Sequence, residues 1–164
     1  MPSDAVLYQA AALCLTYPDE GFWARLPLLR EAAPQLREFS DHAAVTPPRE
    51  LAAHHVRVFG AGNGHRLHLS TWCDEDARRR GKSPARYEEL YRAHGLEFTG
   101  EALPDYLPAV LEFTARTGDT ALLTEYRDAV ERLRSGLTEY GTPYAAVLDA
   151  VCAVLPAAPD RDRG

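Results

Sequence analysis

The sequence predicts an all-α fold, a single-domain bundle of roughly eight helices. Apolar residues recur at spacings of three and four along several segments. Hydroxyl–proline pairs and glycines separate these segments, as expected where helices begin and end. Alternation of apolar and polar residues is limited to Arg66–Ser70, which is too short to define a strand. With 164 residues, 46% of them apolar, the chain is long enough to bury one substantial core.

The first 44 residues are expected to form three helices. The first runs from Ser3, whose hydroxyl is placed to cap it, to Thr16. Its apolar residues suggest one buried stripe: Val6, Leu7, Ala10, Leu13, Cys14 and Tyr17. The second covers Glu20–Ala33, and Pro27 inside it should kink or split it. A weaker third helix covers Pro34–Ala44.

Three hydroxyl–proline pairs mark further helix starts: Thr46–Pro47, Ser83–Pro84 and Thr142–Pro143. The first two of these helices should end at Gly60 and Gly95, since glycine commonly terminates helices.

The clearest amphipathic pattern predicts one helix from Asp119 to Tyr140, closed by Gly141. Asp128 and Arg132 are spaced to pair across one turn on its solvent face. A shorter apolar helix should precede it, after the turn that carries Asp105 between two prolines.

The chain is expected to fold as one domain over residues 1–155, with a disordered tail at 156–164. The net charge of −6 argues against nucleic-acid binding, which depends on basic residues that neutralise phosphates. No run of about 20 apolar residues predicts a membrane span, and no signal peptide is visible, so we expect a cytoplasmic protein. The three cysteines, Cys14, Cys73 and Cys152, suggest no disulfide framework.

One metal site must be weighed. His65, His68 and Cys73, with Asp74 or Asp76, offer donor types that zinc accepts. Their spacing matches no common site, so a polar loop without metal is the favoured interpretation. A small helical metal-dependent enzyme stays open as an alternative, as does a structural adaptor.

The most charged part of the chain follows directly. Asp74, Glu75 and Asp76 precede Arg78, Arg79 and Arg80. The three arginines form a candidate docking loop, because long loops often carry binding functions. The alternative is a solvated loop whose charges neutralise one another.

A candidate peptide-binding site comprises Tyr87, Tyr91, Asp105, Tyr106 and Glu112. Asp105 lies between two prolines near a helix start, where it either favours the helix dipole or receives a basic group from a peptide. The tyrosines are either core residues or anchors for an amphipathic peptide.

Four stretches carry a family resemblance: Leu13–Ala32, His54–Gly81, Tyr91–Phe113 and Thr142–Pro156. In this order they resemble the assembly chaperones of respiratory nitrate reductase, within the wider group of TorD-like redox-enzyme maturation proteins. One departure is clear, because Tyr106 stands where the family block usually has a histidine after Pro-Asp.

The resemblance implies an all-helical protein without catalytic activity or a cofactor of its own. Its partner would be the apo catalytic, molybdenum-containing subunit of nitrate reductase. The protein would hold the N-terminal segment of that subunit in the cytoplasm until the molybdenum cofactor is inserted. A maturation chaperone of another molybdoenzyme is the nearest alternative.

Overall fold

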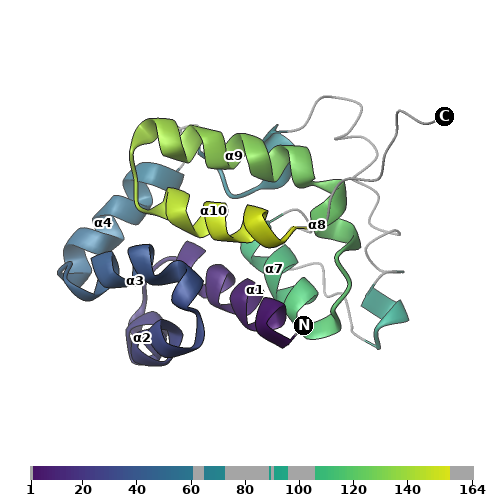
Figure 1. The fold of residues 1–164 in the computed structure, drawn as a ribbon. Coiled ribbons are helices and arrows are strands. Elements are labelled where there is room, and N and C mark those ends of the chain that lie inside the picture. Colours follow the sequence, from purple (N-terminus) through teal and green to yellow (C-terminus); the bar gives the residue numbers. More distant parts are fainter. Residues whose placement is uncertain (1, 61–64, 73–88, 90, 96–105, 156–164) are drawn as a thin grey trace.

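The computed structural model in Figure 1 describes residues 2–60, 65–72, 89, 91–95 and 106–155. Within these ranges the chain forms eight α-helices and two short 3₁₀-helices. The β-structure of the same residues is one isolated antiparallel bridge between His68 and Tyr106. The predicted all-α, single-domain bundle is therefore confirmed.

The helices follow one another in the order α1 (Pro2–Leu15), α2 (Glu20–Ala32), η1 (Pro34–Leu36), α3 (Arg37–Ala44), α4 (Pro48–Phe59), η2 (Leu69–Trp72), α7 (Leu107–Thr117), α8 (Ala121–Glu125), α9 (Arg127–Tyr140) and α10 (Tyr144–Val154). α10 packs between α9 and α1, and α1 packs in turn against α7. The helices α2, α3 and α4 gather at the end of the bundle where α1 finishes (Figure 1).

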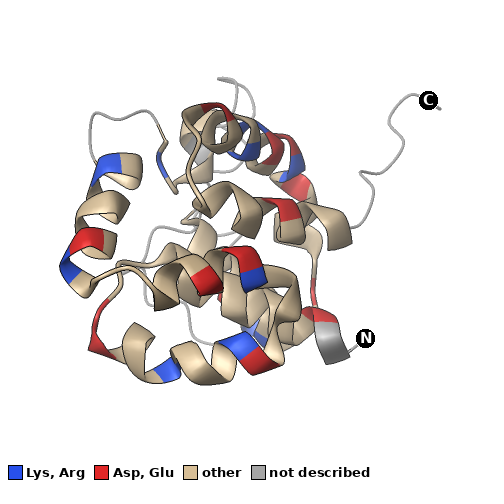
Figure 2. Ribbon diagram, turned by 60° about the vertical axis from the view of Figure 1, so that its left-hand side comes forward, with Lys and Arg blue, Asp and Glu red and all other residues tan. Residues whose placement is uncertain are grey.

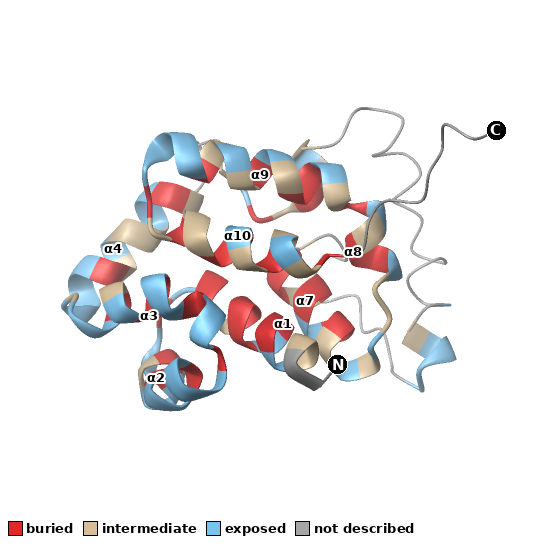
Figure 3. Ribbon diagram, in the orientation of Figure 1, coloured by how far each residue is buried: buried red, intermediate tan, exposed pale blue. Residues whose placement is uncertain are grey.

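The central helix α1 is buried on more than one side, as the burial colours of Figure 3 show. Its buried residues are Leu7, Tyr8, Ala10, Ala11, Ala12, Cys14 and Leu15. The small side chains among them allow α7 and α10 to approach from different directions. Val6 and Tyr17, which the single predicted stripe placed inside, are exposed. Leu7, Ala10 and Cys14 of the predicted stripe are buried, but one stripe does not describe α1, because a central helix is apolar nearly all round.

Several predicted helix starts are shifted. α1 begins at Pro2, so Ser3 lies inside the helix and not before it. Pro27 does not split α2, which is one helix capped by the Asp19 carboxylate accepting the Phe22 N–H at 2.9 Å. The Thr46 hydroxyl does not cap α4 but donates back to the His42 carbonyl at the end of α3.

The predicted helix over Asp119–Tyr140 is two helices, α8 and α9, separated at the buried residue Tyr126. The two pack on different neighbours, because α8 contacts α7 whereas α9 contacts α10 and η2. The predicted pair of Asp128 with Arg132 does not form. The Arg132 guanidinium donates instead to the carbonyl oxygen of Trp72, with Nη1 at 2.7 Å.

Gly60 and Gly141 end α4 and α9 where the sequence predicts it. Gly95 and Gly141 have φ values of 70° and 87°, a left-handed conformation that glycine adopts without steric cost. The Gly141 N–H donates to the Leu137 carbonyl and so closes α9.

An aromatic cluster around Tyr144 fixes α4 to the bundle. The Tyr144 ring stacks on His54 at a centroid distance of 5.6 Å and contacts Phe39 and Phe59 at 4.8 Å each. His54 Nε2 lies 2.7 Å from the Thr142 hydroxyl, which joins α4 to the start of α10. Because α10 packs on α1 and α9, this contact ties the α2–α4 end to the rest of the bundle.

Candidate functional site

The candidate site is built on α7, whose two faces differ in character. One face is largely apolar, and α7 packs against α1. The buried residues of α7 are Leu107, Pro108, Val110, Leu111, Phe113 and Thr114. On the opposite face Glu112 and Arg116 are exposed, one turn apart. α7 ends at Gly118, which has a φ of 76°. The spacing of its apolar residues therefore positions Glu112 at the surface.

Tyr91 packs against α7. Its ring stacks on Phe113 of α7, with ring centroids 4.8 Å apart and an interplanar angle of 27°. Burial raises the pKa of the Tyr91 hydroxyl, and the negative charge of Glu112 raises it further, while Arg116 opposes both. Tyr91 is thus half-buried and within the electrostatic field of Glu112.

Tyr106 approaches the same acid from the start of α7. It is the residue before the helix, in an extended conformation, and its ring lies 5.0 Å from the His68 ring. Burial raises the pKa of the Tyr106 hydroxyl, and Glu112 again adds to the effect. We refer to Tyr91, Tyr106 and Glu112 as the tyrosine–glutamate face.

The structure thus associates three of the five predicted peptide-binding residues. The other two, Tyr87 and Asp105, lie outside the described residues, as do Arg78, Arg79 and Arg80 of the candidate docking loop. Their roles stay predictions.

The Glu112 carboxylate is available for a partner. Within the described residues it forms no ion pair and no hydrogen bond, although Arg116 is one turn away on the same helix. Some other acids of the described residues are paired, such as Asp41 with Arg30 at 2.7 Å and Asp149 with Arg134 at 3.2 Å, whereas Glu38 and Asp128 are, like Glu112, without an ion pair. An unpaired acid whose charge acts on two half-buried tyrosines suits a ligand that carries a basic group next to apolar surface.

The sequence did not reveal the residues that hold Tyr91 in place. His94 Nε2 lies 2.9 Å from Asp119 Oδ2, and the His94 ring contacts Phe113 edge-on at 5.6 Å. The hydrogen bond from His94, followed by that from the Ala121 N–H, lowers the pKa of Asp119. The two residues are 25 positions apart, and no spacing rule for helices connects such a distance.

The described residues do not support the alternative metal site. His65 packs on Tyr140 with ring centroids 5.3 Å apart, whereas His68 packs on Tyr106, so the two imidazoles face different partners. Among the described residues no group of three or more potential metal ligands comes together. Cys73, Asp74 and Asp76 lie outside those residues.

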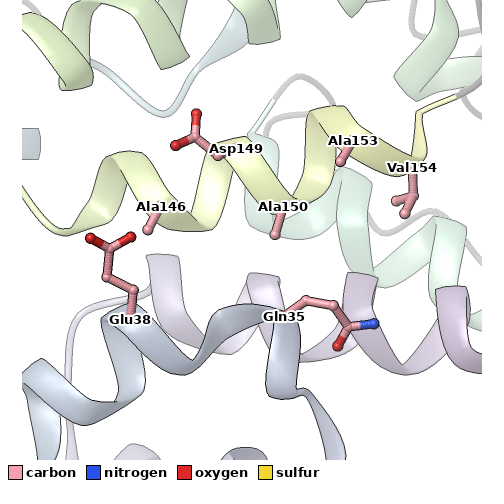
Figure 4. Close-up of a pocket in the computed structure, with 7 residues that line it drawn as sticks. All are labelled: Gln35, Glu38, Ala146, Asp149, Ala150, Ala153 and Val154. Atoms are coloured by element: carbon pink, nitrogen blue, oxygen red, sulfur yellow. The ribbon is translucent and has the colours of Figure 1, made fainter.

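An open pocket of about 320 Å³ lies between α10 and the η1–α3 segment (Figure 4). Its floor consists of small side chains of α10, including Ala146, Ala150 and Ala153. The charged residues that line it are Glu38 and Asp149, and Asp149 is already paired with Arg134. The pocket thus brings together no set of groups suited to acid–base or nucleophilic chemistry.

The distribution of charged residues and the length of the helices bear on nucleic-acid and membrane interactions. Figure 2 shows acidic and basic residues interspersed along the described helices, without one strongly basic element. None of the described helices is both long enough and apolar enough to cross a membrane.

Comparison with known proteins gives relatives that align over most of this chain. The chain is 30% identical over 162 residues to the Bacillus subtilis protein named "Probable nitrate reductase molybdenum cofactor assembly chaperone NarJ", covering 92% of this chain and 88% of that protein. It is 25% identical over 163 residues to nitrate reductase molybdenum cofactor assembly chaperone NarJ of Escherichia coli K12. That alignment covers 91% of this chain and 69% of the Escherichia coli protein.

A further relative is much longer. The chain is 31% identical over 155 residues to nitrate reductase-like protein NarX of Mycobacterium tuberculosis H37Rv. The alignment covers 90% of this chain but only 24% of NarX. The family model described as "Nitrate reductase delta subunit" matches residues 25–150, which include the whole of α7 and its contacts with Tyr91. This chain therefore belongs to the nitrate reductase delta subunit family.

Proposed function

We propose that this protein is a chaperone that binds the catalytic subunit of nitrate reductase during assembly and molybdenum cofactor insertion. Membership of the delta subunit family and relatives named as assembly chaperones support this role. The observation that supports a site for this role is the tyrosine–glutamate face, in which the charge of Glu112, an acid without a partner among the described residues, acts on two half-buried tyrosines.

The ligand of this face is the N-terminal segment of the apo catalytic subunit, bound as an amphipathic peptide. Tyr91 and Tyr106 offer apolar ring surface together with hydroxyl groups, a combination enriched at binding hot spots. Glu112 receives a basic side chain of the peptide through a charge-assisted hydrogen bond. Tyr87 and Asp105 belong to the same proposed site, and the arginines 78–80 form a proposed second docking element.

The mechanism is a shift of populations and needs no catalysis by this chain. A chaperone that binds the apo-subunit and not the finished enzyme keeps the subunit in its open, cofactor-accepting state. Cofactor insertion and folding then compete with binding and release the chaperone. The protein acts in the cytoplasm before the enzyme is complete and carries no cofactor of its own.

Co-purification tests this proposal at the level of the partner. The tagged chain is expressed with the nitrate reductase catalytic subunit in cells that either make or lack molybdenum cofactor. We expect the subunit to co-purify mainly from cells that lack the cofactor. Equal recovery from both cells, or none from either, would refute the chaperone role. Co-expression with the catalytic subunit of another molybdoenzyme is the control for specificity.

A further inference from the structure

The tyrosine–glutamate face has a neighbour that comes from a distant part of the sequence. His68 and Tyr106 form an antiparallel bridge, and the Leu107 N–H donates to the Leu67 carbonyl at 2.9 Å. The rings of His68 and Tyr106 lie with their centroids 5.0 Å apart and their planes inclined by 37°. The imidazole is therefore placed against one of the two tyrosines of the face.

Two features fix the direction of His68. Leu67 and Leu69 on either side of it are buried, with 5% and 0% of their surface exposed, so the side chain between them is directed away from the core. The 65–72 segment is also fastened to α9. The Trp72 carbonyl accepts from Arg132 at 2.7 Å, and the Trp72 ring lies over Gly136.

The nitrogen atoms of His68 have no partner in the part of the chain that the structure describes. Within the described residues no hydrogen bond reaches them, although the ring is half-buried. Other histidines of the bundle do use their nitrogens: His54 meets Thr142, His55 meets the Leu15 carbonyl, and His94 meets Asp119. A neutral imidazole offers one donor and one acceptor, which here lie next to Tyr106.

We infer that His68 is a fourth residue of the tyrosine–glutamate face and forms a hydrogen bond with a polar group of the bound peptide. This inference rests on the proposed function. It predicts a ligand with a basic group for Glu112, apolar surface for the tyrosines, and a polar side chain or main-chain group that reaches His68. The 65–72 segment would then form a wall of the binding site and not only a link between helices.

The test is the affinity of a fluorescently labelled synthetic peptide, matching the N-terminus of the nitrate reductase catalytic subunit, measured by anisotropy. His68→Phe keeps an aromatic ring against Tyr106 and removes both nitrogens. Its peptide affinity should fall about two- to tenfold, the range that one net hydrogen bond represents, with an unchanged melting temperature. His68→Gln, which keeps a donor and an acceptor, should bind more tightly than His68→Phe.

A purely structural role gives a different pattern. In that case His68→Ala lowers both the melting temperature and the affinity, while His68→Phe behaves as the wild-type protein does. That result overturns the inference. Should His68→Phe not fold, His68→Leu provides the same comparison with His68→Gln, and equal affinity of these two overturns the inference.

Glu112→Gln separates this inference from the proposed function. If the wild-type protein binds the peptide, Glu112→Gln weakens binding, and His68→Phe does not, the inference fails and the function stands. If the wild-type protein does not bind the peptide at all, the proposed site and this inference fail together.

Discussion

His94 and Asp119 are joined by a hydrogen bond of 2.9 Å between Nε2 and Oδ2 that closes the segment carrying Tyr91 onto the end of α7. The bond is partly shielded, since the two side chains are only 29% and 26% exposed. It acts beside two ring contacts with Phe113, one from Tyr91 and one from His94. The position of Tyr91 in the tyrosine–glutamate face therefore depends on a contact outside that face.

Loss of this hydrogen bond should loosen Tyr91 more than it unfolds the bundle. For His94→Ala we expect the free energy of unfolding to fall by about 1 kcal/mol, the net value of one hydrogen bond. Peptide affinity should fall as well, because Tyr91 is no longer held. Chemical denaturation and anisotropy measure the two effects. Arg92→Ala, on the same segment and exposed, is the matched control. Equal peptide affinity of the two variants would contradict the role of the His94–Asp119 hydrogen bond in positioning Tyr91.

Neutralising Glu112 should weaken binding without affecting folding. The side chain is exposed and forms no ion pair within the described residues, so Glu112→Gln should change the free energy of unfolding by less than about 0.5 kcal/mol. A lost charge-assisted hydrogen bond should cost about 1.5–3 kcal/mol of binding free energy, and the salt dependence of binding should decrease. Glu139→Gln on α9, also exposed, controls for net charge. If Glu139→Gln has the same effect, the role of Glu112 is only that of overall charge.

Gly136 lies where the side chains of the 65–72 segment pack on α9. A β-carbon at this position would lie 3.2 Å from His65 Cδ2 and 3.4 Å from Trp72 Cη2. The larger side chain of Gly136→Val should displace both rings and lower the free energy of unfolding by about 1–3 kcal/mol. Trp72 fluorescence and denaturation check this. Ser135→Val, at the exposed neighbouring position, should have little effect. Equal stability of both variants would show that the contact contributes nothing.

The stability of the protein should decrease as the pH falls below neutrality. Burial lowers the pKa of His54 and of His55; nearby Arg57 also lowers that of His54, and the hydrogen bond to Leu15 partly opposes the effect at His55. Both pKa values lie below the unfolded value of about 6.5, so the unfolded chain binds more protons in that window. The stabilisation is complete above pH 6.5 and is lost as the pH falls toward the folded pKa values.

Thermal melts between pH 7.5 and 5 measure this effect. His55→Gln should flatten the pH dependence, because one of the two groups no longer titrates. His68→Gln, which removes a histidine outside the Tyr144 cluster, serves as the control. A steeper pH dependence of His55→Gln than of the wild-type protein would contradict the role given to burial.

Local sequence signals predicted this fold well where a single residue determines a local feature, such as the end of a helix. Gly60 and Gly141 end α4 and α9 as expected, and Cys14 is buried in the core. The break at Tyr126 was missed because a spacing of three and four continues through it. The helix is interrupted because its two parts pack on different partners: α8 packs on α7, whereas α9 packs on α10 and η2. This is a tertiary effect that local spacing does not encode.

The candidate site was predictable in part for the same reason. Tyr91, Tyr106 and Glu112 stand in one recognisable stretch of sequence, so residue type and family resemblance indicated them. His68 contacts Tyr106 across 38 residues of chain, and His94 contacts Asp119 across 25, separations that no helical periodicity encodes. His94 reaches Asp119 and His68 reaches Tyr106 because α7 and its neighbours fold together.

The central claim is that the tyrosine–glutamate face binds the N-terminal segment of the nitrate reductase catalytic subunit. Anisotropy of the labelled N-terminal peptide, titrated with the wild-type protein and with a Tyr91→Ala/Glu112→Gln double variant, tests it most directly. We expect saturable binding to the wild-type protein and at least tenfold weaker binding to a double variant that is still folded. If the peptide does not bind while the full-length subunit does, or if the double variant binds as tightly as the wild-type protein, the claim is contradicted.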